Sequence, residues 1–367
     1  MITHIKWVVF LLILFTLGLI FFNSSWTILD MTFTAGNYTC QSSSKVGEED
    51  KKPLKYILYY SKFYAFTDWF EFGYGQEPFI KNDCCVNNCF VTNNRSLLAN
   101  IRDFDSIIFN TRNIYQFKFP TKRSSKQFYV YFSYESPFLD GINGSESRFN
   151  SFFNLTMTYR RDSDIYTPFG KTEKLTEQSK WEPLKNDTRQ LAVWIVSHCK
   201  TNSRREEYVK ELKKWMPLDQ FGHCNKKACA DNEKCYDSME GNYKFYLSFE
   251  NSLCQDYVTE KFWNFLGQNI VPIVLGSGPY KEIAPPNSYI DVKDYKSPKE
   301  LATYILYLDK NPEEYNKYLE WKRLYKVIIP MRKMFNQSMC ELCQRIQSGE
   351  RREYPEFGQW WENTCYG

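Results

Sequence analysis

The chain has 367 residues, of which 43% are hydrophobic and 18% aromatic, so it can bury a large core and is long enough for two domains. Its formal net charge is only +4, and its basic residues are interspersed with acidic ones. This pattern excludes the clustered basic face that nucleic-acid binding requires. We therefore expect a folded protein that has no nucleic-acid partner.

The first apolar segment indicates a membrane anchor. Residues 7–22 (WVVFLLILFTLGLIFF) follow Lys6 and can nearly span a bilayer as a helix. A cleaved signal peptide is the alternative, but no small-residue cleavage motif follows Phe22. We expect a cytosolic tail at 1–6 and an uncleaved transmembrane signal-anchor at 7–26. The protein would then be a single-pass type II protein of the Golgi membrane with a lumenal body.

Sequons support this lumenal location. The chain has seven Asn-x-Ser/Thr motifs, and the one at Asn23 is too close to the membrane to be used. The remaining glycosylation candidates are Asn37, Asn94, Asn143, Asn154, Asn186 and Asn336.

The twelve cysteines all lie outside the anchor, and in an oxidising lumen they are expected to form disulfides. Cys340 and Cys343 are three residues apart and would share one face of a helix, so they can reach Cys84 or Cys85 together with Cys89. A zinc site is the alternative. The chain has only three His residues and no second matched Cys-x-x-Cys pair, which favours disulfides.

After a polar stem at 27–53, apolar segments alternate with amphipathic ones. Strands are expected at 55–60, 106–110, 128–132, 191–197, 244–249 and 270–275, and helices at 204–215, 259–266 and 297–308. Such alternation predicts parallel sheets covered on both faces. We expect an α/β fold with two Rossmann-like domains, at 54–185 and 186–345, and a C-terminal tail at 346–367. The chain lacks a Gly-x-Gly-x-x-Gly fingerprint, which disfavours a dinucleotide oxidoreductase.

Residues 256–261 (DYVTEK) form the segment best suited to bind a charged ligand. They place a capping residue, the carboxylate of Glu260 and the ammonium of Lys261 at a predicted helix start. Free N–H groups and the helix dipole favour a diphosphate there. Lys261 would add a full charge, and Glu260 can accept hydrogen bonds from ribose hydroxyls. An ordinary capped surface helix would have the same composition, so the segment alone leaves both interpretations open.

Residues 245–261 resemble the most characteristic block of the α1,3/α1,4-fucosyltransferases, glycosyltransferase family 10, and the sequence is similar to invertebrate members. Three further blocks follow the family pattern, at 135–137 (ESP), at 159–170 and at 192–199 with 203–212. The resemblance covers roughly residues 54–345. It implies a GT-B fold, in which two Rossmann-like domains face a cleft, and transfer of fucose from GDP-fucose with inversion.

The resemblance also assigns roles to individual residues. The positions that match the family's GDP-fucose site are Arg160, Arg205, Asn251, Tyr257, Glu260 and Lys261. Arg204 is adjacent to Arg205, which leaves open which arginine neutralises the departing GDP. Glu135 matches the family's general base, which would deprotonate the acceptor hydroxyl. From its position alone Glu135 would be taken for a solvated loop carboxylate.

The resemblance implies that the acceptor is a GlcNAc residue of a glycoprotein or oligosaccharide glycan, in the N-glycan core or in a Lewis-type lactosamine antenna. The aromatic segment 63–79 is a candidate acceptor surface, although packing under the sheet would explain it equally well. No obligate cofactor or metal is expected, and Mn²⁺ or Mg²⁺ would at most stimulate the enzyme.

Two other functions are weighed against this one. A non-catalytic glycan-binding protein could share the scaffold, but the presence of Glu135, Glu260 and Lys261 together argues against lost activity. Residues 162–164 (Asp-Ser-Asp) have the pattern of the manganese site of GT-A glycosyltransferases, which would hold Mn²⁺ against a donor diphosphate. They lie inside a block that follows the fucosyltransferase pattern, which favours the first interpretation.

Overall fold

The structure is a computed structural model of the chain. It describes residues 53–112, 118–140, 142, 145, 147–185, 187–225, 232–329 and 331–366. The expected membrane span at 7–26 lies outside these ranges, as do the sequons at Asn37, Asn143 and Asn186. Within the described ranges, no helix has the length and apolar character needed to cross a bilayer.

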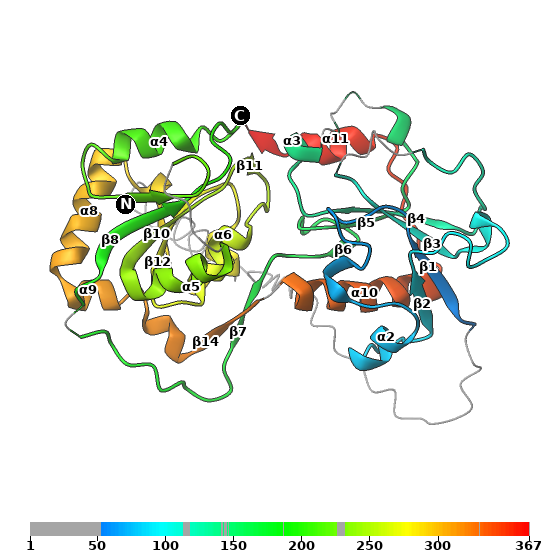
Figure 1. Cartoon of the computed structure of the whole chain (residues 1–367), viewed down its shortest axis with the longest axis horizontal. Helices are drawn as coiled ribbons and strands as arrows, with labels where there is room; N and C mark the ends of the chain where they lie inside the picture. Colours follow the sequence, from blue (N-terminus) through cyan, green and yellow to red (C-terminus); the bar gives the residue numbers. More distant parts are fainter. Residues whose placement is uncertain are drawn as a thin grey trace, which may run out of the picture. The chain divides into compact units, whose positions relative to one another are not determined.

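The first sheet has six parallel strands in the order β2-β1-β3-β4-β5-β6 (Figure 1). The strands are β1 Lys55–Tyr59, β2 Cys89–Thr92, β3 Ser106–Asn110, β4 Phe128–Ser133, β5 Leu155–Thr158 and β6 Ile165–Tyr166. Every residue of β3 and β4 is buried, as expected for central strands covered on both faces. The strand order reverses between β1 and β3, and ligands of such sheets bind outside the carboxyl ends of the strands at this point.

The second sheet has five parallel strands in the order β13-β12-β10-β8-β9. The strands are β8 Gln190–Ile195, β9 Asp219–Phe221, β10 Tyr243–Phe249, β12 Val271–Leu275 and β13 Ile290–Asp291. Its order reverses between β8 and β10, so this sheet repeats the arrangement of the first. Each half of the chain thus has its own ligand-binding edge.

The remaining elements cover or connect the sheets. The helices are α2 Glu77–Lys81, α3 Pro137–Asp140, α4 Arg205–Leu212, α5 Asn232–Asn242, α6 Glu260–Leu266, α7 Tyr280–Ile283, α8 Pro298–Lys310, α9 Pro312–Asn316, α10 Met331–Ser348 and α11 Phe357–Glu362. The 3₁₀ turns are η1 Trp69–Glu71, η2 Ile101–Asp103, η4 Ser147–Phe149, η5 Val292–Asp294 and η6 Glu320–Arg323. Two antiparallel pairs join β7 Lys171–Lys174 to β14 Tyr325–Ile328 and β11 Leu253–Cys254 to β15 Cys365–Tyr366.

The expected helix 204–215 is shorter than predicted. Helix α4 ends at Leu212, and its buried side chains are Arg205, Val209 and Leu212. Trp215, the last residue of the expected helix, lies beyond the observed helix end with 41% of its surface exposed. The ammonium of Lys299 lies 4.4 Å from the centre of its ring.

Helix α10 packs against the first sheet, beside β1 and β6. Its apolar residues Phe335, Met339 and Leu342 belong to the core that β1, β3 and β4 also form. The predicted second domain, 186–345, included most of this helix. In the structure the chain returns to the first lobe at α10. The reason is long-range packing, which connects residues far apart in the sequence.

Two disulfides fix α10 to the first lobe and confirm the expected cross-links. Cys340 pairs with Cys84, and Cys343 pairs with Cys89. Cys85, the alternative candidate, is also disulfide-bonded. Two further bridges, Cys199–Cys224 and Cys254–Cys365, lie in the second half of the chain. The last one ties β15 at the C-terminus to β11.

The three described sequons differ in exposure. Asn94 is exposed, whereas Asn154 and Asn336 are half-buried. The side-chain oxygen of Asn154 accepts a hydrogen bond from the backbone N–H of Tyr129 at 3.1 Å, and the amide of Asn336 donates to Asn82 at 2.8 Å. Asn94 is therefore the most accessible of the three for glycosylation.

Candidate active site

A buried carboxylate organises the ligand-binding edge of the second sheet. Glu250 follows β10 directly and is fully buried. Its carboxylate accepts hydrogen bonds from the backbone N–H of Thr259 at 2.8 Å and from the Thr259 hydroxyl at 2.9 Å. Thr259 is the N-cap of α6, so Glu250 fixes the start of that helix beside the end of β10.

Lys261 is held between two carboxylates at this helix start. Its Nζ lies 3.0 Å from Glu260 Oε1 and 3.4 Å from Glu250 Oε2. Burial lowers the pKa of Lys261, but the charges of Glu260 and Glu250 outweigh burial and raise its pKa above the ordinary value. The side chain keeps 20% of its surface exposed, so its positive charge is accessible at the ligand-binding edge.

Arg205 and Arg204, which the sequence could not separate, have different surroundings. The guanidinium of Arg205 is buried and donates to the backbone carbonyls of Phe249 and His198 at the ends of β10 and β8. Burial lowers the pKa of Arg205. The side chain of Arg204 is 74% exposed and pairs with Glu207 at 2.6 Å. The structure therefore brings Arg205, and not Arg204, to the strand ends where Glu250 lies.

Several buried polar atoms at this edge have no hydrogen-bond partner among the described residues. They are Arg205 Nε, Asn251 Oδ1 and the hydroxyl of Tyr280. Buried polar groups are rarely left unpaired, so their concentration here fits a site that a polar ligand completes. Arg205 Nε can donate a hydrogen bond to a phosphate oxygen, and Asn251 Oδ1 can accept one from a hydroxyl group. Together with the charged Lys261, these atoms suit a phosphorylated ligand with hydroxyl groups.

Glu135 lies just after the carboxyl end of a strand in the first lobe, as Glu250 does in the second. It follows β4, and the hydroxyl of Ser133 accepts a hydrogen bond from the Glu135 backbone N–H at 3.0 Å. Its Oε1 accepts hydrogen bonds from the hydroxyl of Tyr64 at 2.6 Å and from Arg112 Nη1 at 3.0 Å. The guanidinium of Arg112 also stacks on the Tyr64 ring at 4.2 Å. The side chain is 19% exposed, so the carboxylate is accessible but oriented.

Tyr257 links this carboxylate to the second lobe. Its ring is buried, and its hydroxyl lies 3.5 Å from Glu135 Oε2, at the long end of hydrogen-bond distance. Close by in sequence, Ser252 and Ser136 share a hydrogen bond of 2.8 Å. Glu135 therefore contacts Tyr257, which precedes α6, through Oε2 and residues of its own lobe through Oε1.

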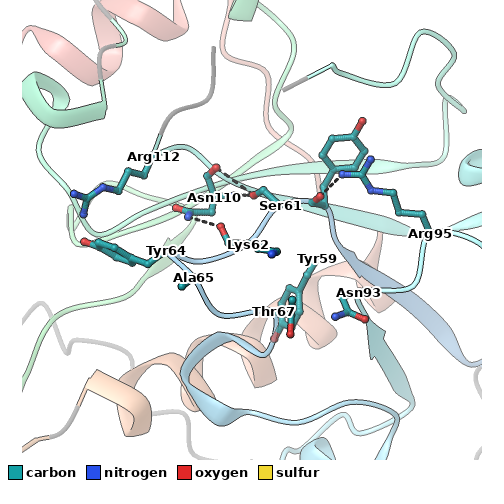
Figure 2. A pocket seen from close by; sticks show the side chains of 11 residues that line it. Tyr59, Ser61, Lys62, Tyr64, Ala65, Thr67, Asn93, Arg95, Asn110 and Arg112 are labelled. Carbon is teal, nitrogen blue, oxygen red and sulfur yellow. Dashed lines mark hydrogen bonds between the residues drawn. The ribbon is translucent and has the colours of Figure 1, made fainter. Parts of the chain in front are cut away.

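A cavity of about 740 Å³ opens beside the Oε1 side of Glu135. Tyr64 and Arg112, which bind Oε1, also line it. Figure 2 shows Tyr64 and Arg112 beside each other and Arg95 on the other side of the pocket. The cavity lies at the carboxyl ends of the neighbouring strands β1, β2 and β3, where the order of the first sheet reverses; its lining residues are Tyr59, Tyr60, Ser61, Lys62, Tyr64, Ala65, Thr67, Asn93, Arg95, Asn110 and Arg112.

The aromatic segment 63–79 has both buried and exposed side chains. Trp69 and Phe72 are buried in the first core, while Tyr64, Phe66 and Tyr74 are exposed. Tyr64 has a φ of 53° in a tight turn whose flanking residues exchange two backbone hydrogen bonds. This left-handed conformation is uncommon for a residue other than glycine. The segment therefore contains both core residues and exposed aromatic residues, and among the exposed ones Tyr64 lines the cavity.

Arg160 has partners other than those expected of a donor-binding residue. Its guanidinium pairs with both oxygens of Asp162, at 2.8 and 2.6 Å, and donates to the backbone carbonyl of Trp360. It also stacks on the Trp360 ring at 4.3 Å. These contacts join the first lobe to α11, and no described contact joins Arg160 to Glu250 or Lys261.

The carboxylates of the Asp-x-Asp segment are likewise engaged within the protein. Asp162 holds Arg160, as described above, and accepts from the Trp360 indole at 3.0 Å. Asp164 accepts from the hydroxyl of Tyr354 and the backbone N–H of Thr156, both at 2.7 Å. The two side chains therefore have separate structural partners, which explains the motif without a manganese site.

Sequence reasoning did not single out two residues of this site, Glu250 and Arg112. Glu250 lies within the block 245–261, and a carboxylate close to a predicted helix cap was the signal that could have identified it. Tyr64 lies in the candidate acceptor segment 63–79, but it and Arg112 contact Glu135 from 71 and 23 residues away, so no local pattern could reveal these contacts.

Comparison with known proteins gives a consistent result. The family model described as "Glycosyltransferase family 10 (fucosyltransferase) C-term" matches residues 185–360, and "Fucosyltransferase, N-terminal" matches residues 52–170. Alpha-(1,3)-fucosyltransferase C of Drosophila melanogaster is 31% identical over 77% of this chain and 71% of its own length. Alpha-(1,3)-fucosyltransferase fut-1 of Caenorhabditis elegans is 37% identical over 65% of this chain, which spans 58% of that relative. The chain therefore belongs to glycosyltransferase family 10, the fucosyltransferases, and resembles invertebrate members.

A solved structure is similar in fold. The crystal structure of an alpha1,3-fucosyltransferase with GDP aligns with 83% of this chain and 93% of its own, at a TM-score of 0.51 and 16% identity. At this identity the likeness concerns the fold alone. It agrees with the α/β architecture of parallel sheets described above.

Proposed function

We propose that this protein is an inverting α1,3-fucosyltransferase that moves L-fucose from GDP-fucose to a GlcNAc residue of a glycan. The observation that carries the proposal is the position of Glu135. One oxygen of its carboxylate contacts residues that line the first-lobe cavity, and the other contacts the hydroxyl of Tyr257, which precedes the helix that carries Glu260 and Lys261. A base in this place can act on an acceptor from one side and face a donor on the other.

The donor would occupy the edge of the second sheet. Lys261 and Arg205 supply positive charge for the diphosphate, and Glu260 can accept hydrogen bonds from the ribose hydroxyls. The unpaired Asn251 Oδ1 can accept a hydrogen bond from a donor hydroxyl, and Tyr257 would flank the fucose. Because Glu250 binds both Thr259 and Lys261, it would act as a positioning residue for this half of the site.

The acceptor would enter the first-lobe cavity. Its reacting hydroxyl can replace the Tyr64 hydroxyl as the hydrogen-bond donor to Glu135 Oε1, since both groups are neutral O–H donors. The ion pair with Arg112 keeps the carboxylate oriented during this exchange. The expected acceptors are the N-glycan core and Lewis-type lactosamine antennae.

The reaction is a single displacement at the fucose anomeric carbon. The acceptor oxygen forms a bond to that carbon while the bond to the diphosphate oxygen breaks, and the leaving electron pair stays with GDP. Glu135 takes the acceptor proton. Lys261 and Arg205 stabilise the negative charge that develops on the departing diphosphate. Attack from the face opposite the leaving group inverts the configuration.

Further properties belong to the same proposal. The two sheets would act as the two Rossmann-like domains of a GT-B enzyme that closes on its substrates. Residues 7–26 would anchor the protein in the Golgi membrane with its body in the lumen, where Asn94 is the best described candidate for glycosylation. The charges of Lys261 and Arg205 would serve the diphosphate without an obligate metal, and Mn²⁺ or Mg²⁺ could stimulate the enzyme.

The test is Glu135→Gln in the full-length protein. It keeps the shape of the side chain but removes the base, so transfer should fall by about 100-fold to 10,000-fold while GDP binding stays within about threefold. Glu207→Gln, at an exposed glutamate of α4, is the matched control and should transfer at the wild-type rate. A Glu135→Gln protein that transfers as fast as the parent would refute the assigned base. Donor and acceptor binding without transfer by the wild type would instead favour the glycan-binding alternative.

A further inference from the structure

We infer that the first-lobe cavity selects glycan acceptors that carry an anionic substituent, such as a carboxylate, sulfate or phosphate, close to the fucosylated sugar. This inference rests on the proposed function, because it assigns the cavity to the acceptor. It concerns the choice among acceptors, which neither the family assignment nor the chemistry of transfer determines.

The charges of the cavity are unbalanced. Three of its lining residues are cationic, namely Lys62, Arg95 and Arg112, and none is acidic. Glu135 neutralises Arg112 through their 3.0 Å ion pair. Lys62 and Arg95 remain, and no described carboxylate forms an ion pair with either. The cavity therefore has an excess positive charge on the side away from the base.

Asp68 is a further carboxylate near the cavity, and no described ion pair joins it to Lys62 or Arg95. Asp68 lies close enough to Tyr59 to contribute to the rise in its pKa, which burial mainly causes. However, Asp68 is not a lining residue, and its Oδ1 accepts a hydrogen bond from the backbone N–H of Gly73 at 2.9 Å.

Arg95 is held in place for recognition. Its guanidinium lies 3.8 Å from the centre of the Tyr60 ring and donates to the Tyr60 backbone carbonyl. An arginine restrained in this way loses little freedom when it binds a ligand, and its remaining N–H groups match the paired oxygens of a carboxylate, sulfate or phosphate. In Figure 2, Lys62 lies between Arg95 and the pair formed by Tyr64 and Arg112.

The donor does not explain these cations. Its diphosphate would be neutralised by Lys261 and Arg205, which come from the second sheet. The contact between Tyr257 and Glu135 Oε2 faces that sheet, whereas the cavity is reached through Oε1. A neutral acceptor would need hydroxyl and amide partners such as Asn93 and Asn110, but no excess charge. An anionic group on the acceptor would pair with both Lys62 and Arg95.

The experiment compares matched acceptors with the full-length enzyme and GDP-fucose. A neutral lactosamine glycan is set against the same glycan bearing a terminal sialic acid, a sulfate or a phosphate, and these three arms identify the anion. We expect at least one anionic acceptor to have a kcat/KM about tenfold above the neutral one. Equal or lower values for all three anionic acceptors would overturn the inference.

Variants locate the effect. Arg95→Met and Lys62→Met should each remove most of the preference, mainly through KM for the anionic acceptor, while transfer to the neutral acceptor continues. Lys310→Met, at the exposed end of α8, is the control and should leave the preference unchanged. A preference that survives in the Arg95→Met, Lys62→Met double variant would contradict the assigned residues. If the wild-type protein transferred fucose to none of these acceptors, the result would instead count against the proposed function.

Discussion

Arg205→Met, compared with Arg204→Met, tests how the donor site is built. The two arginines are adjacent, yet Arg205 is 3% exposed at the ends of β8 and β10 whereas the Arg204 side chain is 74% exposed and paired with Glu207. Removal of a charged donor that acts on the leaving group should lower kcat by about 100-fold, equivalent to about 2.7 kcal/mol. Arg204→Met should stay within about threefold of the parent, since exposed ion pairs contribute little.

The assay is GDP release coupled to product formation, with KM for GDP-fucose measured separately. Arg205→Met also leaves the Phe249 carbonyl without its donor, which should lower the free energy of unfolding by about 1–3 kcal/mol. Thermal unfolding and GDP binding must therefore show that each variant is folded. Arg205→Lys is a second comparison, because it keeps the charge but loses the planar fork, and an intermediate rate is expected. Similar rates for the Arg204 and Arg205 methionine variants, both folded, would refute the reasoning.

Two further predictions concern stability. Burial raises the pKa of Asp140 to about 7. Because the folded state holds this proton and the unfolded state releases it near pH 4, wild-type stability should decline as pH rises from about 4 to about 7, by as much as about 4 kcal/mol. Asp140→Asn should flatten this slope in unfolding experiments at several pH values, and an unchanged slope would contradict the assignment. Replacing both Cys254 and Cys365 by Ser should lower the free energy of unfolding by about 2–4 kcal/mol and raise KM for GDP-fucose, because Cys254 lies between Asn251 and Tyr257 in the sequence. The equivalent change at Cys89 and Cys343 should destabilise the protein without raising KM for GDP-fucose. If this KM rose in both double-serine variants, the bridge near the donor would have no special effect.

Much of the fold could be predicted because its strands are continuous apolar runs. Residues 106–110 form β3 with the expected bounds, and Ser297 caps α8 through a hydrogen bond from the backbone N–H of Glu300. Short edge strands such as β6, with two residues, carry no such signal. The position of α10 could not be predicted either, because its apolar pattern does not name a partner and its packing on the first core joins residues far apart in the sequence.

The candidate site was predictable where its residues are close in sequence. Glu260 and Lys261 lie at a capped helix start, which local rules identify. The choice of Arg205 over Arg204 depends on which side chain is turned toward the strand ends, and this requires the three-dimensional structure. The contacts of Glu135 with Tyr64 and Tyr257 span 71 and 122 residues, so they arise from topology alone.

The most direct test of the central claim is to identify the product. The full-length protein is incubated with GDP-fucose and a glycan that contains GlcNAc, and the purified product is examined by NMR while GDP release is measured. We predict one fucose per GDP released, joined to O3 of GlcNAc with the anomeric configuration opposite to that of the donor. GDP release without a fucosylated glycan, or a product that retains the donor configuration, would contradict the account.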